Sequence, residues 1–176
     1  MATTTWVIDP THSEIGFKVK HLMISNVKGS FTEFEASVNG DDFFNTPVTA
    51  TIQAGSISTH NTERDTHLKS ADFFDVENHE TITFEGKSFN KVDDDEYKLK
   101  GLLTIKGISN EVALNVTYGG TNKDPWGNEK LALEITGKIN RKDWELNWNA
   151  ALETGGVLVG EEVRILAEVQ FVKQVS

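Results

Sequence analysis

Alternation of apolar and polar residues at a period of two recurs along most of this chain and limits the folds open to it. The most regular example is the stretch 97–106, in which Tyr, Leu, Gly, Leu and Ile occupy the odd-numbered positions and mostly Lys and Thr the even-numbered ones. Such alternation is typical of an antiparallel strand with one face on a core and the other in water. A chain that repeats it from end to end must close its sheet or stack it on another. A closed barrel of about eight strands has an interior wide enough for one small ligand, so the sequence predicts an all-β container.

Local signals interrupt the strand pattern at three places. Pro10 ends a short first strand, because proline has no N–H for a strand ladder. The inward-facing side switches between Phe31 and Phe34, across residues 32–33, which predicts a bulge or a tight turn. Segment 119–129 is rich in Gly, Asn and Asp and is expected to be a loop.

Segment 62–75 breaks the alternation altogether, and we interpret it as a lid that contains the one helix of the chain. The helix is predicted over Glu63–Ser70, with a capping-box-like start at Thr62. A helix this short is marginal alone and must dock on something; the open end of a barrel would receive it. Phe73 and Phe74, directly after the helix, would form an apolar plug.

Composition limits the partners and the location of the protein. The 176 residues fit a single domain, spanning 1–176. Seventeen basic residues against 27 acidic ones give a net charge of −10, which argues against nucleic acid and against an anionic membrane surface. No apolar run approaches the roughly 20 residues of an integral membrane segment. The first six residues lack the basic and apolar regions of a secretory signal, so we expect a cytoplasmic protein, or a periplasmic one if the sequence is a processed form.

Signals for metal binding and catalysis are weak in this sequence. With no cysteine, thiolate nucleophiles and Cys-ligated zinc are excluded. His60, His67 and His79 lie in or near the lid, but none has the spacing of a zinc-binding helix or strand, and ordinary loop histidines are the simpler interpretation. No Gly-x-Ser-x-Gly nucleophile motif occurs. We therefore predict no metal, no cofactor and no catalytic residue, and hence not an enzyme.

Small residues at inward positions and two arginine-containing clusters bear on ligand binding. The small residues leave volume that large neighbours or a ligand must fill; they are Ala50, Ala54, Gly86, Gly101, Gly137 and Ala167. Arg64 precedes an aspartate at the lid, and Arg141 lies two residues before another at a strand end. Each arginine either forms an ion pair that pins the lid or a corner, which is the commoner role, or binds the polar head of a ligand with its fork-shaped donor.

Five blocks of residues follow one another along nearly the whole chain. They read Trp-Val-Ile-Asp-Pro-Thr-His-Ser at 6–13, Arg-Asp-Thr-His-Leu-Lys-Ser with Asp-Phe-Phe-Asp at 64–75, Gly-Leu-Leu-Thr-Ile-Lys-Gly at 101–107, Asn-Arg-Lys-Asp-Trp at 140–144 and Val-Gly-Glu-Glu-Val at 159–163. In this order they resemble the YceI-like family of polyisoprenoid-binding proteins. The resemblance implies an extended antiparallel eight-stranded barrel, lipocalin-like in shape, with a hydrophobic tunnel that holds a long isoprenoid or fatty-acyl chain. It also implies a homodimer in many members.

The resemblance and the strand pattern together define candidate binding residues. We expect the tunnel wall to include Phe17, Val19, Phe31, Phe73, Phe74, Phe84, Leu103, Leu133, Ile135 and Trp144. A polar mouth is expected from His12, His21, Arg64 and Arg141. The protein is thus predicted to bind a long apolar chain as a carrier, storage or stress-related binding protein. Two alternatives stay open: a small-molecule enzyme that uses the His and Asp residues of the lid, and a solid-core barrel that acts as a protein-interaction scaffold.

Overall fold

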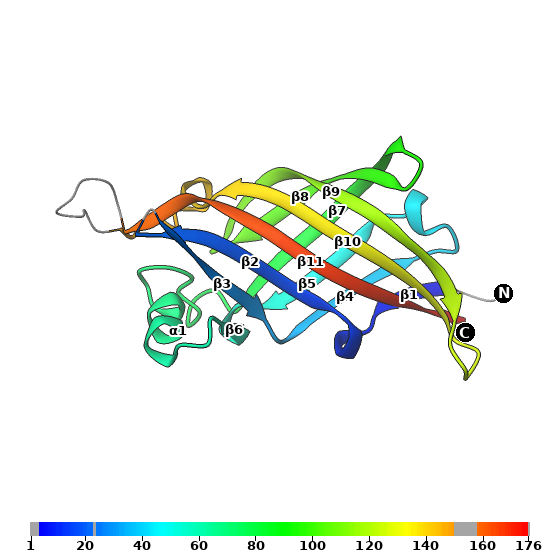
Figure 1. Cartoon of the computed structure of the whole chain (residues 1–176), viewed down its shortest axis with the longest axis horizontal. Helices are drawn as coiled ribbons and strands as arrows, with labels where there is room; N and C mark the ends of the chain where they lie inside the picture. Colours follow the sequence, from blue (N-terminus) through cyan, green and yellow to red (C-terminus); the bar gives the residue numbers. More distant parts are fainter. Residues whose placement is uncertain (1–3, 23, 150–157, 176) are drawn as a thin grey trace.

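Antiparallel strands pair edge to edge around a closed ring, as the alternating pattern predicts (Figure 1). The computed structural model describes residues 4–22, 24–149 and 158–175. The strands within these ranges are β1 (Thr4–Ile8), β2 (Glu14–His21), β3 (Ser25–Phe31), β4 (Phe34–Asn39), β5 (Val48–Gln53), β6 (Ile57–Ser58), β7 (Thr81–Asp93), β8 (Glu96–Ile105), β9 (Ile108–Lys123), β10 (Glu129–Asn140) and β11 (Val159–Val175).

Eight of these strands form the ring, in the order β1-β4-β5-β7-β8-β9-β10-β11, and the pairing of β1 with β11 closes it. The long strand β11 pairs with both β1 and β2 along one edge, β1 near its end and β2 near its start. β3 continues from β2, and β6 pairs with β3. The predicted eight-stranded antiparallel barrel is therefore confirmed.

The interruptions of these walls lie where the sequence places them. Pro10 begins a short 3-10 helix, η1 (Pro10–His12), between β1 and β2, and the Asp9 side chain accepts a hydrogen bond from the Thr11 backbone N–H at its start. β3 ends at Phe31 and β4 begins at Phe34. The change of inward-facing side at residues 32–33 thus reflects a break between two strands.

The loop expected over 119–129 is shorter in the structure. β9 continues to Lys123 and β10 begins at Glu129, so only residues 124–128 connect them. Pairing with β10, from Glu129 opposite Lys123 to Ala132 opposite Gly120, keeps this glycine-containing stretch extended. Tertiary pairing overrides the weak strand propensity of the segment, as is common for sheets.

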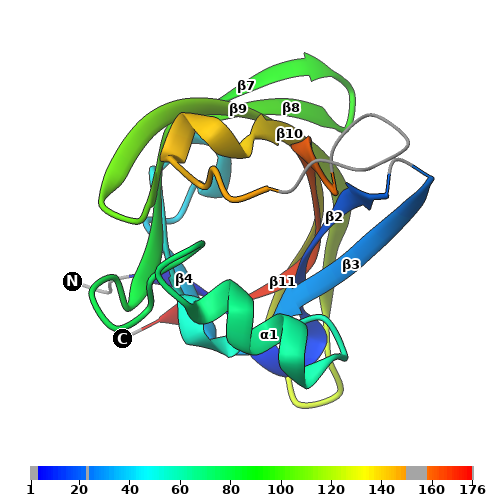
Figure 2. The same cartoon turned by 90° about the vertical axis from the view of Figure 1, so that its left-hand side faces the viewer.

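The predicted helix is confirmed as α1 (Thr62–Lys69), which lies across one end of the barrel (Figure 2). Its cap is one residue earlier than expected: the Asn61 side chain accepts a hydrogen bond from the Arg64 N–H at 3.0 Å. The Asp65 carboxylate, which the capping-box pattern assigns to the helix start, instead binds Thr59. No residue of α1 is fully buried, so the helix depends on contacts around its two ends.

The two ends of the barrel differ. At the end that we call closed, the 3-10 helix η2 (Phe43–Asn45) inserts Phe43 and Phe44 among aromatic residues of the walls, namely Trp6, Phe89, Tyr97, Tyr118 and Phe171. β1 begins and β11 ends at this end (Figure 1). The other end, which we call open, carries α1, the β2–β3 hairpin and the 3-10 helix η4 (Arg141–Trp144).

Inward-facing glycines make room for neighbouring side chains and not for a ligand. A methyl group added to Gly101 would lie 2.5 Å from the Phe84 ring, and one added to Gly137 would lie 2.6 Å from Leu114. Val48 occupies the corresponding space at Gly86. Of the small residues singled out in the sequence, only Ala50 and Ala167 line open space; Ala54 is buried in the core.

Candidate ligand-binding cavity

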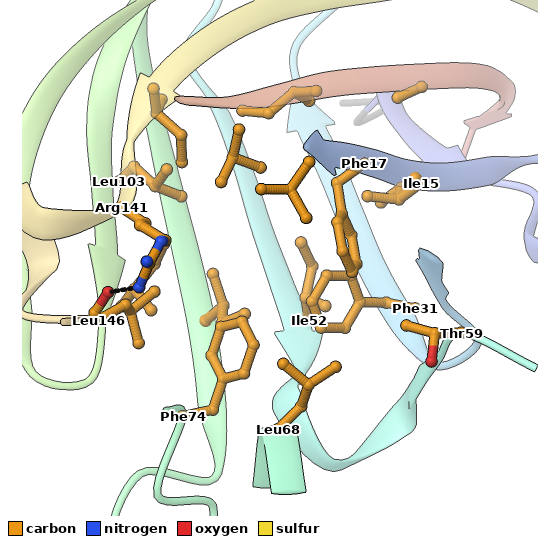
Figure 3. Close-up of a pocket in the computed structure, with 18 of the residues that line it drawn as sticks. Ile15, Phe17, Phe31, Ile52, Thr59, Leu68, Phe74, Leu103, Arg141 and Leu146 are labelled. Carbon is orange, nitrogen blue, oxygen red and sulfur yellow. Dashed lines mark hydrogen bonds between the residues drawn. The ribbon is translucent and has the colours of Figure 1, made fainter. Parts of the chain in front are cut away.

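A cavity of about 570 Å³ occupies the barrel interior and reaches the open end. Its volume lies within the range of about 300–1,000 Å³ that is typical of small-molecule sites. Most of its lining is aliphatic or aromatic, and Figure 3 shows these side chains converging from opposite walls. Among the described residues, the polar or charged side chains that line it are Lys20, His21, Thr59, Asn61, Glu63, Arg64, His67 and Arg141. All of them belong to the open end, so the cavity has a polar mouth and an apolar interior.

Strand register explains the apolar wall. On β2, Ile15 and Phe17 lie opposite Ala167 and Ile165 of β11, and Ala167 in turn lies opposite Ile135 of β10. Because side chains alternate faces along a strand, residues opposite one another in the register share one face. Alternate positions of three neighbouring strands therefore point into the cavity together.

Most of the predicted wall residues line the cavity. They are Phe17, Val19, Phe31, Phe73, Phe74, Phe84, Leu103 and Ile135. Leu133 and Trp144 do not. Leu133 is a core residue that the cavity does not reach. Trp144 is 2% exposed and packs in η4, where its indole N–H donates to the Leu103 carbonyl at 2.9 Å. Periodicity identifies an inward-facing residue, but it does not distinguish a filled part of the barrel from an empty one.

Three of the four residues predicted for the mouth are found there: His21, Arg64 and Arg141. His12 is wrongly placed by the sequence argument. It lies in η1, its side chain is 58% exposed, and its Nδ1 is 2.8 Å from the Asp9 carboxylate. Because η1 lies between β1 and β2, His12 belongs to neither strand, and it is absent from the cavity lining.

Arg64 and Asp65 both bind Thr59, the residue that follows β6. The Arg64 guanidinium donates to the Thr59 hydroxyl and to the Thr59 carbonyl, each at 2.8 Å. Asp65 accepts from the Thr59 N–H at 2.8 Å and from its hydroxyl at 2.5 Å. Every polar group of Thr59, itself 4% exposed, is therefore satisfied by the first turns of α1. An ion pair that pins the lid is the commoner role predicted for this arginine from the sequence. In the structure Arg64 and Asp65 instead both bind Thr59, and in this way they hold the helix at the mouth.

Arg141 is a buried cation, only 3% exposed, that binds backbone carbonyls. Its guanidinium donates to Gly160 at 2.8 Å, Trp148 at 3.0 Å, Val159 at 3.3 Å and Leu146. Burial lowers the pKa of this guanidinium from its ordinary value, and the negative charge of Glu161 partly opposes that shift. With four carbonyl partners, Arg141 fixes the segments on both sides of η4 and β11 at the mouth.

His67 connects the lid to the segment after η4. Its Nε2 lies 2.9 Å from the Asp72 carboxylate, and its ring packs edge-on against Trp148, with centroids 4.6 Å apart. Phe73 contacts both rings. Asp72 does not line the cavity, and no group of three or more potential metal ligands occurs within the described ranges. The mouth therefore holds a His–Asp pair on its rim and no cluster suited to a metal ion among these residues.

Some lining residues were missed although their signal was present. Ile15 and Ile165 follow the alternation that marks an inward face, and only their position along the barrel, set by register, separates them from filled core. Trp148 had no such signal, because it lies outside the regular strands. Its place at the mouth depends on the hydrogen bond between its carbonyl and Arg141. In the parts of the chain that the structure covers, no helix is long and apolar enough to cross a membrane.

Comparison with known proteins gives consistent matches over nearly the whole chain. Residues 6–171 match the YceI-like domain family. A UPF0312 protein of Staphylococcus aureus strain N315 is 46% identical over 171 residues, which cover 96% of this chain and 97% of the relative.

Solved structures share the fold. A YCEI protein of Campylobacter jejuni is similar with a TM-score of 0.74 and 33% identity, covering 93% of this chain and 95% of that one. BcnA of Burkholderia cenocepacia is similar with a TM-score of 0.80 and 21% identity, covering 93% and 98%. A polyisoprenoid binding domain from Saccharophagus degradans has a TM-score of 0.70 at 13% identity, covering 95% and 97%. With a family match over nearly all of its length and a relative 46% identical, this chain belongs to the YceI-like domain family.

Proposed function

We propose that this protein binds one long apolar chain, of the polyisoprenoid or fatty-acyl type, inside the barrel, and that it acts as a non-catalytic carrier or storage protein. The observation that carries the proposal is a cavity of about 570 Å³ whose interior is apolar and whose polar lining is confined to one end. Each methylene buried in such an interior contributes roughly 0.8 kcal/mol. A chain of many methylenes or isoprene units is held without any polar contact along its length.

The arrangement of the two ends supports a direction of entry. The tail passes the lid and extends toward Phe171, the aromatic lining residue against which Phe43 packs with ring centroids 5.0 Å apart. A polar head stays at the open end. Arg141 donates four hydrogen bonds to backbone carbonyls, whereas Arg64 donates two, both to Thr59. Arg64, His21 and Lys20 on the rim are therefore the freer groups for such a head.

Two further observations favour this function over the alternatives. The barrel contains a cavity, which the solid-core scaffold does not predict. An enzyme that used the lid would need a histidine and a carboxylate that face the cavity and bind each other. Asp72, which lies beside His67, is 54% exposed and does not line the cavity. Glu63 lines the cavity, but within the described residues it has no histidine nitrogen within 4.0 Å. The polyisoprenoid binding domain of Saccharophagus degradans has the same fold and a named ligand class in agreement with the proposal.

Mass spectrometry of an organic-solvent extract of the purified protein, against a matched blank, tests the proposal directly. We expect one long-chain isoprenoid or fatty-acyl species at near-stoichiometric amount. If the protein is purified empty, delipidated protein should bind a fluorescent polyene fatty acid, and a polyisoprenoid alcohol should displace it. The proposal would be overturned if no lipid were extracted and the delipidated protein did not bind the probe.

A matched pair of variants shows whether any bound chain occupies the cavity. Ala167→Phe adds an aromatic ring at the centre of the wall, opposite Ile135 and Ile15. Leu166→Phe adds the same ring one position away, on the exposed face of β11, where Leu166 is 43% exposed. We expect Ala167→Phe to lower probe binding by at least tenfold and Leu166→Phe to leave it unchanged. Equal binding by the two variants would place the ligand outside the barrel.

A further inference from the structure

Four basic residues form a continuous row across the outer wall near the open end. Lys138 of β10 lies opposite Arg164 of β11, Arg164 lies opposite Lys18 of β2, and Lys18 lies opposite Lys28 of β3. We call this set the basic row. Figure 1 shows the four strands side by side on one face of the barrel.

The basic row points away from the cavity. The neighbours of Lys18 on β2, Phe17 and Val19, line the cavity, and so do Val163 and Ile165 on either side of Arg164. Alternation along each strand therefore turns the basic side chains outward. At about 4.8 Å between neighbouring strands, the row is roughly 14 Å long. Lys28, Lys138 and Arg164 are exposed.

Stability does not account for the basic row. Like charges directly opposite one another on neighbouring strands are destabilising, and here three such pairs follow in succession. Arg164 has a carboxylate partner, Glu162, at 3.4 Å. Within the described residues, Lys18, Lys28 and Lys138 have no carboxylate within 4.0 Å. Four residues further toward the closed end, the corresponding row is acidic, with Glu134 opposite Glu168 and Glu168 opposite Glu14.

Exposed apolar side chains lie beside the basic row at the tip of the β2–β3 hairpin. Ile24 is 85% exposed and Leu22 is 42% exposed. The hairpin ends where His21 pairs with Ser25, three register positions beyond the Lys18–Lys28 pair, or about 10 Å along the strands. The same hairpin contributes His21 to the rim of the cavity. An apolar tip, a set of cations behind it and a cavity mouth are thus combined in one edge of the molecule.

We propose that the hairpin tip and the basic row dock the open end of the barrel on an anionic lipid bilayer. Leu22 and Ile24 enter the interface between headgroups and acyl chains, while the basic row contacts lipid phosphates. Apolar side chains next to cations suit a bilayer, which offers both a nonpolar interior and surface charge. The phosphate backbone of a nucleic acid would contact the cations but would not bury the apolar tip. The net charge of −10 is a sum over the whole chain and does not exclude a local row of four basic residues.

Sedimentation of the full chain with vesicles tests the docking surface. We expect binding to vesicles of phosphatidylcholine and phosphatidylglycerol, weakening as salt is added, and little binding to phosphatidylcholine alone. Each basic residue near an anionic surface strengthens binding by about fivefold, so Lys18→Glu/Lys28→Glu should weaken it by at least about 25-fold. No binding by the unmodified protein to the anionic vesicles would overturn the proposal.

Matched controls separate the docking surface from overall charge and from folding. Lys98→Glu/Lys100→Glu makes the same change in net charge on β8, which is not part of the basic row, and should bind within about twofold of the unmodified protein after correction for net charge by salt titration. Ile24→Ser, at an exposed position that leaves the fold intact, should weaken binding and preserve its salt dependence. Equal vesicle binding by the two double variants would overturn the proposal, as would nucleic-acid binding through the same lysines without vesicle binding.

This docking does not rest on what the cavity holds. The cavity-blocking variant Ala167→Phe should bind anionic vesicles as the unmodified protein does, because the change lies inside the barrel. If the protein binds anionic vesicles but neither carries a lipid nor binds the probe, the docking proposal stands and the proposed function is overturned. If it binds the probe but not the vesicles, the proposed function stands and the docking proposal is overturned.

Discussion

At the closed end of the barrel, aromatic rings pack against one another, whereas at the open end a helix without buried residues is held by hydrogen bonds. Phe43 contacts four other aromatic rings, Trp6, Phe44, Phe89 and Phe171. α1 is tied by Thr59, Arg64 and Asp65 and by the contact of His67 with Trp148. Regions with few buried apolar contacts open locally at lower free energy than a core. The comparison predicts that the open end of the barrel has a lower local stability than the closed end.

The largest expected effect is at the closed end. Phe43→Ala removes a 4%-exposed ring from the centre of the aromatic cluster and should lower the free energy of unfolding by about 3–5 kcal/mol. Phe73→Ala at the open end should cost less, because its neighbours His67 and Trp148 can relax into the space. Urea unfolding of both variants measures the difference. Equal losses of unfolding free energy in the two variants would show that the two ends do not differ in how tightly their aromatic rings are packed.

Arg141 is the one strong anchor that we identify at the open end. Arg141→Leu removes the side-chain donor to the carbonyls of Gly160, Leu146 and Trp148, and should lower the free energy of unfolding by roughly 3 kcal/mol. Arg141→Lys keeps the charge but loses the fork geometry, so its free energy of unfolding should lie between those of the unmodified protein and the leucine variant. Stability of the leucine variant equal to that of the unmodified protein would show that these bonds contribute little.

Removal of the hydrogen bonds between Asp65 and Thr59 should destabilise α1 and leave the closed end of the barrel unchanged. Asp65→Ala removes Oδ1, which accepts from both the N–H and the hydroxyl of Thr59, and should destabilise α1 by about 1–2 kcal/mol. Hydrogen exchange followed residue by residue should show faster exchange in α1 and unchanged protection in β1 and β4. Asp65→Asn, which retains one acceptor oxygen, is the control. Faster exchange at the closed end as well would mean that the two ends are coupled.

The smallest effect belongs to the wall between the ends and depends on pH. Hydrogen bonds from the Thr11 side chain, and then from His12, hold the pKa of the Asp9 carboxyl well below its ordinary value. A carboxyl with a lowered folded-state pKa stabilises the protein above its unfolded pKa of about 3.9, and this contribution is lost as the pH falls through the folded pKa. The difference in unfolding free energy between the unmodified protein and Asp9→Asn should therefore shrink below about pH 4. A difference that stays constant across that range would contradict this assignment.

Local sequence signals predicted a large part of the fold and some of the site. Pro10, the change of parity between Phe31 and Phe34, and the helix after Asn61 each depend on neighbours in the chain. Alternation likewise identified the inward positions of Phe17 and Ile135. Trp144 and His12, which belong to the blocks that carry the family resemblance, lie in 3-10 helices and do not line the cavity.

Alternation by itself determined that this chain forms amphipathic strands around an apolar interior, because side-chain direction along a strand is a local property. Only the tertiary structure decided which of the inward residues face empty space. Leu133 fills the barrel and Ala167 borders the cavity, although both are inward on long strands. Register likewise brought Lys138, Arg164, Lys18 and Lys28 into one row. These residues are far apart in sequence, and pairing between strands alone sets their distance.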